Sequence, residues 1–574
     1  MLWTAHSWFS LRYGLMSPAE VVQAALEMNL THVVLADIMN TSGVWDFVST
    51  ALEQGVRPIC GVVFRDDKAG VPLFTAIAQN NAGFEEICAA LSNHLQGKDC
   101  VSGPRRPRIW QHVQVVYPWK RVESAPQLYR DLSNHEWVGI HHWEVPQYGL
   151  LHKTHGIAPK RCIALHSMVF RHKRDWNCHR ILRAIDHNAL LSQMTDTRNG
   201  HPDQRVKSRE GIEAGFEDHP LLTANANQLV QSCSIEMPSP PAGRLHNNQH
   251  TYTGSEEQDE ALIRSLCAEG FSYRYPDHDE PVVERMEMEL AVIRQQGYLA
   301  YFLINWDITS YARSRGYFHV GRGSGANSLV AYLLRITDVD PIELDLYFER
   351  FINLYRTNPP DFDIDFSWTD RDDVTRYIFE RFEHVALVGA YSTFQYRAVI
   401  RELGKVFGLP KHDVDVLASG KFNPNQLGDI ERIVLEYAGY LRDFPNALTI
   451  HACGILIADR PISHFCGTFL PPKGYPTTQF DMVVAEDIGL YKFDILSQRG
   501  LGKIRDTMDL IAQSDPKAAA AIDIHDMQKF KTDENIKRLL RGALAVGCFY
   551  VESPAMRMLM RKLQVDTYLG LVAA

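Results

Sequence analysis

Three aspartates alternate with apolar residues within residues 359–366. This period is that of a β-strand, and it places Asp361, Asp363 and Asp365 on one face. Like charges so close together repel each other, and a bound cation relieves that repulsion. Carboxylate oxygens are the ligands that Mg²⁺ and Mn²⁺ prefer, so the segment predicts a site for such an ion. Taken alone, it is explained as well by a solvated edge strand with an acidic outer face.

Glycines are concentrated in residues 319–328, directly before the apolar helical pattern of residues 329–334. Glycine lets the backbone approach a ligand closely, and a glycine loop that opens a helix points its amide groups at an anion. The segment therefore predicts a phosphate-binding loop.

A second strand-like run, residues 489–496, places Lys492 and Asp494 on one face. Taken alone, this run is better explained by a strand with a structural salt bridge. Together with the acidic strand and the glycine loop, it supplies the parts that two-metal nucleotidyl transfer requires. Carboxylates bridge two cations, while backbone amides and basic side chains hold a triphosphate in line.

Periodicity along the chain indicates the elements that position these residues. In residues 1–235, short apolar runs alternate with helical patterns, which is typical of βα units. Strands are predicted at 33–36, 59–64 and 73–78, and helices at 44–54, 283–296 and 302–315. Residues 237–257 are rich in proline, glycine and asparagine and predict an interdomain linker.

Length and composition restrict the class of protein. A chain of 574 residues with 45% hydrophobic and 22% charged residues is typical of a folded multidomain protein. The ten cysteines include no CxxC pair, which argues against a disulfide framework or zinc knuckle and indicates reduced, mostly buried thiols. We expect a cytoplasmic protein without a membrane span. The net charge of −10 restricts any DNA binding to local basic patches.

Several motifs follow one another in a specific order. They are GRGSG at 321–325, FERF at 348–351, PDFDIDF at 360–366 and KFD at 492–494. In this order and spacing, they resemble the palm of the bacterial C-family DNA polymerases, the family of DNA polymerase III alpha subunits. The similarity continues through TF at 393–394, AVIR at 398–401, HACG at 451–454, TQFD at 478–481, ES at 552–553 and MR at 556–557. The resemblance therefore covers nearly the whole chain.

The resemblance implies a multidomain α/β fold. A barrel-like PHP domain would precede a nucleotidyltransferase-type palm, similar to that of DNA polymerase beta, with a helical thumb and partial fingers. The implied boundaries are 1–235 for the PHP-like domain, 236–257 for the linker, 258–391 and 447–497 for the palm, 392–446 for the thumb, and 498–574 for the start of truncated fingers. Family members normally continue through the rest of the fingers, a clamp-binding region and an oligonucleotide-binding domain.

The resemblance also assigns roles to particular residues. The two Mg²⁺ ions, for which Mn²⁺ could substitute, would be held by Asp361, Asp363 and Asp494, with Asp365 as a neighbour. The incoming nucleotide would be bound by Arg322, Gly323, Ser324, Arg350 and Lys492. Primer-template phosphates would meet Arg397, Arg401 and Lys405, which recur every four residues on one helical face. A solvated charged face is the alternative there. In the fingers, a basic helical cluster is expected at Arg557, Arg561 and Lys562.

The first domain departs from the metal-binding pattern of PHP domains. His6 remains of the opening histidine pair, with Trp3 and Thr4 nearby, and Asp37 is followed by Ile38 instead of a histidine. Other expected ligand positions are occupied by Val62, Val63, Ser167 and Val169. Apolar side chains cannot ligate a cation, so we expect a degenerate metal site and a structural scaffold. An unexpected cluster of His141, His142, His152 and His155 is the alternative.

The function that these features predict is template-directed addition of deoxynucleoside triphosphates to a primer 3′ end. Primer-template DNA and deoxynucleoside triphosphates would be the partners. A sliding clamp and other replisome or repair subunits would bind through regions outside this chain. The degenerate metal site and the His319-Val320 pair before the glycine loop resemble the error-prone branch of the family. Two alternatives remain, namely a non-catalytic polymerase-like module that binds DNA or a replisome partner, and a phosphoesterase in the PHP domain.

Overall fold

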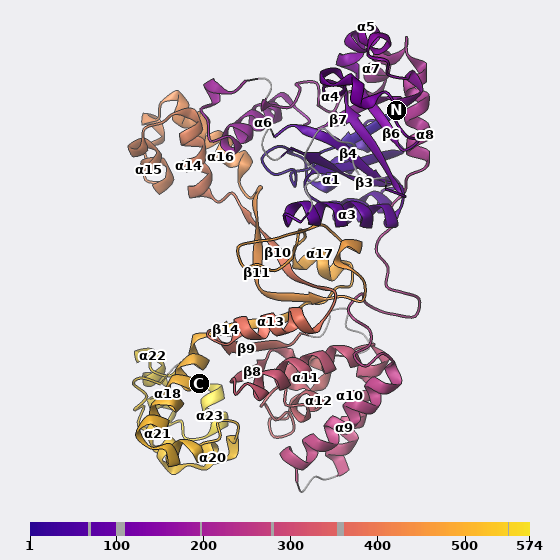
Figure 1. Cartoon of the computed structure of the whole chain (residues 1–574). Coiled ribbons are helices and arrows are strands. Elements are labelled where there is room, and N and C mark those ends of the chain that lie inside the picture. Colours follow the sequence, from indigo (N-terminus) through magenta and orange to yellow (C-terminus); the bar gives the residue numbers. More distant parts are fainter. Residues whose placement is uncertain (67–69, 99–109, 196–197, 277–279, 353–360, 549) are drawn as a thin grey trace. The chain divides into compact units, whose positions relative to one another are not determined.

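The computed structural model describes residues 1–66, 70–98, 110–195, 198–276, 280–352, 361–548 and 550–574. They form two compact units, which the chain enters in alternation (Figure 1). The first unit contains Met1–His250 and Phe382–Phe493, and the second contains Thr251–Arg381 and Asp494–Ala574. No helix in the described part of the chain is both long enough and apolar enough to cross a membrane.

Seven strands close into a barrel in the first unit, as the resemblance to PHP domains implied. The strands are β1 Leu2–Ala5, β2 His32–Ile38, β3 Arg57–Arg65, β4 Pro72–Ala78, β5 Val113–Pro118, β6 Glu136–His141 and β7 Cys162–Met168. Neighbouring strands run parallel, except that β4 is antiparallel to both β3 and β5. The strands predicted at 33–36, 59–64 and 73–78 are confirmed.

Helices pack around the barrel, and the last of them contributes to its interior cluster. They are α1 Pro18–Glu27, α2 Val44–Glu53, α3 Asn81–Leu95, α4 Trp119–Ser124, α5 Val145–His155, α6 Lys173–Asp186, α7 Arg209–Glu213 and α8 Pro220–Gln231. The predicted helix at 44–54 is confirmed as α2. Inside the barrel, Leu2, Ile59 and Leu165 belong to an apolar cluster that Leu229 and Val230 of α8 complete. The barrel interior is therefore a packed core and not a channel.

A helical lobe follows in the same unit. It contains α14 Tyr396–Phe407, α15 Lys411–Ser419 and α16 Asp429–Leu441, between strands β10 Val385–Thr393 and β11 Pro445–Ile457. Buried residues such as Leu403 and Val434 share one apolar cluster with Ile181 and Leu182 of α6, so the lobe rests on the barrel domain (Figure 1). β12 Thr468–Phe469 and β13 Thr477–Thr478 extend the β10–β11 pair in the order β12-β13-β10-β11, and α17 Met482–Asp487 follows.

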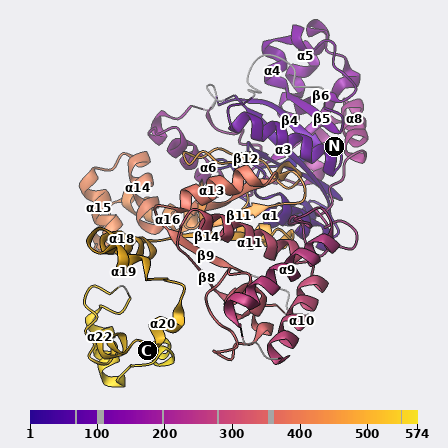
Figure 2. The ribbon, with the colours of Figure 1, turned by 60° about the horizontal axis from the view of Figure 1, so that its bottom comes forward.

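Helices form much of the second unit. They begin with α9 Glu256–Arg274, α10 Glu280–Gln295, α11 Leu299–Ser314, α12 Leu329–Leu333 and α13 Arg371–Arg381. α9 and α10 run side by side in both views (Figures 1 and 2), with Arg264 and Glu287 2.7 Å apart between them. The helices predicted at 283–296 and 302–315 are confirmed, and each begins three residues earlier than its apolar pattern.

Three short strands carry the candidate chemistry in the second unit. β14 Phe493–Gln498 is parallel to β9 Asp363–Ser367, and β8 His319–Arg322 pairs antiparallel with the other edge of β9. The predicted strand at 359–366 begins only at Asp363, and residues 359 and 360 lie outside the described part of the chain. Residues 319–322, predicted as loop, form β8.

The strand predicted at 489–496 also begins later, at Phe493. Gly489 has a positive φ of 70°. The Asn248 side chain then donates to the Tyr491 carbonyl at 2.6 Å and accepts from the Tyr491 amide at 2.7 Å. These contacts use the backbone groups of Tyr491 that a strand ladder would need, so the prediction for residues 489–492 is wrong.

The end of the described chain is helical. After β14 come α18 Arg499–Ser514, α19 Pro516–Ala520, α20 Met527–Thr532, α21 Glu534–Arg541, α22 Pro554–Leu563 and α23 Tyr568–Ala573. Arg561 and Lys562 are exposed on α22, whereas Arg557 is half-buried and donates to the Glu552 carbonyl at 3.0 Å.

Candidate active site

The three predicted metal ligands lie together in the second unit. Asp494 of β14 stands opposite Asp363 of β9 in the parallel register, and Asp361 lies two residues before β9 begins. One oxygen atom from each of the three carboxylates lies within 4.8 Å of the other two. Asp494 is buried, while Asp361 and Asp363 are half-buried. Three carboxylates at this separation are a donor set that fits hard divalent cations.

A buried tyrosine lies next to the carboxylates. Tyr301 of α11 is fully buried, and its hydroxyl accepts a hydrogen bond from the Phe362 amide at 3.4 Å. Burial raises the pKa of Tyr301, and the negative charges of Asp361 and Asp494 raise it further. Tyr301 therefore stays protonated beside the carboxylates, and its ring forms part of their apolar support.

Arg322 of β8 is engaged by two of the aspartates. Its Nη1 lies 2.6 Å from Asp363 Oδ2, and its Nε lies 2.6 Å from Asp365 Oδ2. Asp365 is buried, whereas almost half of the Arg322 side chain is exposed. The sequence predicted Arg322 as a phosphate ligand and Asp365 only as a neighbour. The structure gives Asp365 a specific contact, because it anchors Arg322 beside the carboxylate cluster.

The glycine segment turns sharply next to these residues. Gly323 has φ 82° and ψ −161°, a conformation open almost only to glycine. A Cβ built on Gly323 would lie 3.4 Å from Asp363 Oδ2, so the backbone passes directly beside the acidic cluster. Ser324 is half-buried, and its hydroxyl lies 3.4 Å from the Asp361 carbonyl. The predicted loop residues are therefore brought to the carboxylates.

We expect Gly323→Ala to destabilise the protein by about 1–3 kcal/mol, because alanine is strained in this backbone conformation. Urea denaturation of both proteins measures the difference. Gly439→Ala in α16 is the matched control, since nothing lies within 4 Å of the added Cβ, and it should leave stability unchanged or raise it by up to about 1 kcal/mol. Equal stability of Gly323→Ala and the wild type would contradict the strain argument.

The helix that follows the glycine segment does not offer its N-terminus to an anion. α12 has only five residues, and its first amides are already bound by Glu289 of α10. The Glu289 carboxylate accepts from the Leu329 amide at 3.0 Å, the Val330 amide at 3.1 Å and the Ser328 hydroxyl at 2.8 Å. The prediction that the N-terminus of this helix binds phosphate is therefore wrong. The turn around Gly323 and the Arg322 side chain remain as candidate phosphate ligands.

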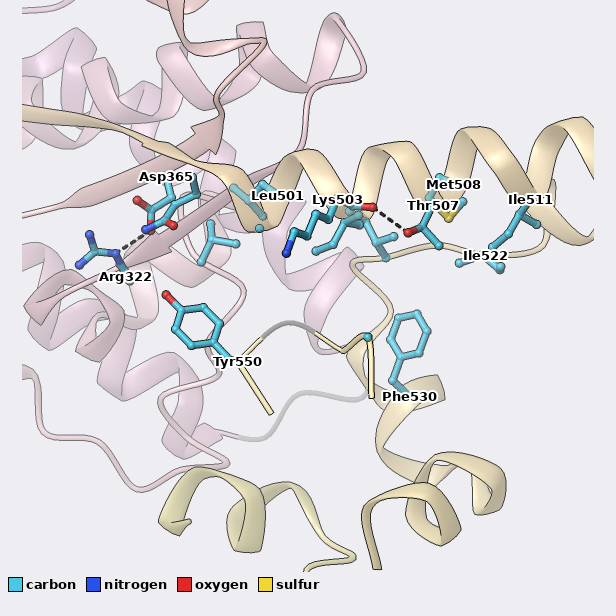
Figure 3. Close-up of a pocket in the computed structure, with 16 residues that line it drawn as sticks. Arg322, Asp365, Leu501, Lys503, Thr507, Met508, Ile511, Ile522, Phe530 and Tyr550 are labelled. Atoms are coloured by element: carbon cyan, nitrogen blue, oxygen red, sulfur yellow. Dashed lines mark hydrogen bonds and ion pairs between the residues drawn. The ribbon is translucent and has the colours of Figure 1, made fainter. Parts of the chain in front are cut away.

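A cavity of about 680 Å³ opens beside the Arg322–Asp365 pair (Figure 3). Its walls are mostly apolar side chains, namely Leu501, Ile504, Met508, Ile511, Ile522, Ile524 and Phe530. The Tyr550 hydroxyl points toward Arg322 and Asp365 at one end (Figure 3). Asp365 Oδ1 is buried there without a hydrogen-bond partner among the described residues. The cavity has the size of a small-molecule site and a polar end next to the carboxylates.

The other predicted basic residues lie in different places. Arg350 is exposed in a short 3-10 turn, Phe348–Arg350, and Lys492 is half-buried two residues before Asp494. On α14, Arg397, Arg401 and Lys405 are all exposed and point away from the buried face of the helix. Arg401 lies 3.6 Å from Asp415, and Lys405 lies 2.8 Å from Glu402. DNA binding by this face stays a prediction.

The positions predicted to have lost metal ligands surround one end of the barrel. Thr4, His6, Ile38, Val63 and Ser167 line a common cavity. The two hydroxyls, Thr4 Oγ1 and Ser167 Oγ, are 2.9 Å apart and bind each other. His6 Nδ1 lies 2.5 Å from the Ala36 carbonyl, and burial lowers the pKa of His6 to about 4. Among the described barrel residues, no three acidic, histidine or cysteine side chains bring ligand atoms within 4.8 Å of one another.

The four histidines considered as a cluster do not form one. His141 and His142 contact the Trp143 ring, whereas His152 and His155 lie in α5, where they contact Tyr148 and Trp119. These histidines were considered as a cluster only because their residue numbers are close.

Asp37 is the acid retained at this end of the barrel, and it is fully buried. It accepts hydrogen bonds from the Ser7 amide, the Ser7 hydroxyl and the Ser10 hydroxyl, each at 2.7 Å. Burial nevertheless raises the pKa of Asp37 from 3.8 to about 6, although these hydrogen bonds oppose the shift. Between these two pH values, the folded state holds a proton that the unfolded state has released.

Stability should therefore fall as the pH rises from about 4 to about 6, by up to about 3 kcal/mol from this group. Asp37→Asn should remove that part of the pH dependence. Urea denaturation of both proteins at pH 4 and pH 7 measures it. Asp218→Asn, which changes an exposed acid in the same unit, should keep the wild-type slope. An unchanged slope in Asp37→Asn would show that Asp37 ionises normally in the folded protein.

Comparison with known proteins assigns both parts of the chain. Residues 4–121 match the family model described as PHP domain, and residues 261–497 match that described as Bacterial DNA polymerase III alpha NTPase domain. A closed PHP barrel followed by this second domain defines the class of PHP-containing bacterial polymerase chains. Across 99% of its length, the chain is similar to DNA polymerase III alpha subunits.

Two relatives illustrate the similarity. The DNA polymerase III subunit alpha of Escherichia coli is 28% identical over 99% of this chain and 54% of its own length. The Error-prone DNA polymerase of Symbiobacterium thermophilum is 28% identical over 99% of this chain and 56% of its own length. The chain thus spans about half the length of the curated relatives it matches. Among solved structures, a putative metal-dependent phosphoesterase from Bifidobacterium adolescentis covers 38% of this chain at 14% identity, with a TM-score of 0.15.

Proposed function

We propose that the chain carries out template-directed DNA synthesis, adding deoxynucleoside triphosphates to a primer 3′ end. The observation that carries this proposal is the trio of carboxylates at two adjacent strands, Asp363 and Asp494 on the strands and Asp361 just before β9, within a domain that matches the polymerase III alpha family. Its relatives include proteins named DNA polymerase III subunit alpha and Error-prone DNA polymerase.

In this proposal, Asp361, Asp363 and Asp494 hold two Mg²⁺ ions, and Mn²⁺ fits the same oxygen donors. The bound ions would lower the pKa of the primer 3′ hydroxyl and neutralise the leaving pyrophosphate. The role of the chain itself is to fix two carboxylates on a pair of adjacent strands and a third just before them, so that the reacting groups are held in line.

The nucleotide would be bound on the Gly323 side of the carboxylates. The turn at Gly323 and Ser324 brings the backbone close enough to contact phosphate oxygens. Arg322 is exposed enough to turn from Asp363 to a phosphate while Asp365 still holds its Nε. Arg350 and Lys492 are further basic ligands, and the cavity beside Asp365 offers space for the nucleoside.

The exposed basic face of α14 would contact primer-template phosphates. Arg397, Arg401 and Lys405 follow one face, and the two ion pairs there are exposed, so their exchange for phosphate contacts costs little. Such contacts with phosphates carry no sequence information.

Primer extension tests the proposal. A labelled primer-template is incubated with the chain, Mg²⁺ and deoxynucleoside triphosphates, and DNA binding is measured separately by fluorescence anisotropy. Addition of the templated nucleotide is the expected result. DNA binding without nucleotide addition, in either Mg²⁺ or Mn²⁺, would contradict the proposal and show that the chain is a non-catalytic, polymerase-like binding module.

A further inference from the structure

Three arginines lie together in the second unit, at the start of β8. Arg274 ends α9, Arg313 lies in the last turn of α11, and Arg335 follows α12. The Arg335 carbonyl accepts from Arg313 Nη1 at 2.8 Å and lies 3.2 Å from His319 Nε2. His319 is the first residue of β8, whereas Arg322, which contacts the carboxylates, is the last. The length of β8 therefore separates these arginines from the proposed metal site.

Arg274 is held in place by one acid. Its side chain is only 6% exposed, and its Nη2 donates to Asp338 Oδ1 at 2.6 Å and to the Thr337 carbonyl at 3.2 Å. The guanidinium lies over the Tyr332 ring, 4.2 Å from its centroid. Its Nε is buried and has no hydrogen-bond partner among the described residues. The pair with Asp338 thus balances the charge of Arg274 and leaves one donor unused.

The other two guanidinium groups form no ion pair with an acid in the described part of the chain. Arg313 donates to the Arg335 carbonyl and to the Ser310 hydroxyl at 2.7 Å, and both acceptors are neutral. The Arg335 guanidinium lies over the Tyr273 ring, 4.4 Å from its centroid, and Tyr273 is exposed. Two positive charges therefore stand beside an exposed ring without a carboxylate of their own.

The charge of Asp338 is shared between two neighbours. His525 Nδ1 lies 2.7 Å from Asp338 Oδ2, opposite the contact with Arg274. Burial opposes the ionisation of Asp338, but the contacts with His525 and Arg274 hold its pKa well below the usual value. Burial lowers the pKa of Arg313 to about 10, with the charges of Arg335 and Arg274 adding to the shift and Asp338 opposing it. Arg313 stays protonated at neutral pH and lies in a positive field.

The acids that follow Asp338 in the chain have contacts of their own. Asp340 accepts from the Tyr275 hydroxyl at 2.5 Å and from the amides of Ile342 and Glu343 at 2.9 and 3.1 Å. Glu343 pairs with Lys531 at 2.5 Å. Even with Asp340 included, three guanidinium groups face two carboxylates, so the cluster keeps a net positive charge.

Arg335 also has an unfavourable backbone conformation. Its φ is 58°, in the left-handed region that residues other than glycine, asparagine and aspartate seldom adopt. Such strain is found most often at ligand sites. The strained backbone and the guanidinium without an acid belong to the same residue, and both indicate a binding role for Arg335.

We propose that Arg313 and Arg335 bind a phosphate group, while Arg274 and Asp338 form the fixed wall behind them. Guanidinium groups bind phosphate oxygens through paired, charge-assisted hydrogen bonds, and the phosphate supplies the negative charge that these two arginines lack. A DNA strand and free pyrophosphate both carry this group. The site needs no metal ion and does not depend on nucleotide addition at the carboxylates.

Isothermal titration calorimetry of the full chain in EDTA tests the proposal. EDTA removes metal-dependent nucleotide binding, so a failure of the proposed polymerase activity does not affect the result. The probes are inorganic pyrophosphate and a short oligothymidylate without terminal phosphates. The oligonucleotide is titrated into chains that also carry Arg397→Ala, Arg401→Ala and Lys405→Ala, so that the proposed DNA contacts of α14 do not contribute. The probe whose binding depends on Arg335 identifies the source of the phosphate.

At least one probe should bind with a Kd below about 1 mM, and Arg335→Gly should weaken that binding about tenfold or more. Arg294→Ala, which removes an exposed arginine from α10 of the same unit, should bind as the wild type does. Equal affinity of Arg335→Gly and the wild type for both probes would overturn the proposal. The absence of binding by the wild type at millimolar concentrations of both probes would also overturn it.

Thermal unfolding guards against a misfolded variant. Glycine relaxes the left-handed backbone and removes one of the neighbouring positive charges, so Arg335→Gly should unfold at no lower temperature than the wild type. Arg335→Asn also tolerates this conformation and should lose the same binding. The bound probe should raise the unfolding temperature of the wild type but of neither variant. An equal rise in all three proteins would contradict binding at Arg335.

Discussion

Changing Asp494 to asparagine is expected to reduce primer extension by about a thousandfold or more. Asp494 is buried and stands directly opposite Asp363, so the asparagine amide would keep the shape of the side chain and remove its charge. A neutral oxygen there cannot offset the charge of a divalent cation. Single-turnover primer extension in Mg²⁺ measures the effect.

Two comparisons make the Asp494→Asn result specific. Asp372→Asn removes an exposed carboxylate from α13 of the same unit and should retain wild-type extension. Primer-template affinity should be unchanged in Asp494→Asn, because the proposed DNA contacts lie on α14. Primer extension at the wild-type rate by Asp494→Asn would show that the Asp494 carboxylate is not needed for the reaction.

Removing the Arg322 side chain should change two affinities in opposite directions. In the absence of nucleotide, the Arg322 guanidinium occupies Asp363 and adds a positive charge beside the carboxylates. Arg322→Ala should therefore bind Mn²⁺ about three- to tenfold more tightly, a modest gain because almost half of the side chain is exposed. The nucleotide loses a charged phosphate ligand in the same variant, so its affinity should fall about tenfold or more.

Mn²⁺ titration followed by electron paramagnetic resonance, and nucleotide titration by calorimetry, measure the two affinities. Arg315→Ala is the matched control, since Arg315 is an exposed arginine of the same unit in a surface ion pair with Asp373. It should change neither affinity. A loss of Mn²⁺ affinity in Arg322→Ala would mean that Arg322 supports the metal site instead of competing for Asp363.

The carboxylate cluster was predictable from one local pattern together with the family resemblance. Alternation of acid and apolar residues placed Asp361, Asp363 and Asp365 on one face, and the resemblance added Asp494, more than 120 residues later. Pairing of β9 with β14 then brings Asp363 opposite Asp494. The closed barrel was likewise expected from the βα alternation and the family resemblance.

Contacts between distant segments were not predictable. Arg322 reaches Asp363 and Asp365 because β8 pairs antiparallel with β9, and nothing in the glycine segment indicates that partner. Glu289 is a similar case. It lies on the apolar face of α10, among Met286, Leu290 and Ile293, where a charged residue is unusual and indicates a buried partner. The pattern does not say that the partner is the start of α12.

The predicted boundaries of helices and strands were wrong where side chains bind backbone groups. Asn248 binds both backbone groups of Tyr491, and this delays the start of β14 to Phe493.

The metal content of the second unit tests the central claim most directly. The chain is loaded with Mn²⁺, a primer-template and a non-hydrolysable deoxynucleoside triphosphate, and its electron paramagnetic resonance spectrum is recorded. Two ions bridged by the same carboxylates lie about 3.5–4 Å apart, so we predict a magnetically coupled Mn²⁺ pair in the wild type that Asp494→Asn lacks. Uncoupled Mn²⁺ with equal affinity in the wild type, Asp361→Asn and Asp494→Asn would contradict a two-metal site at these residues.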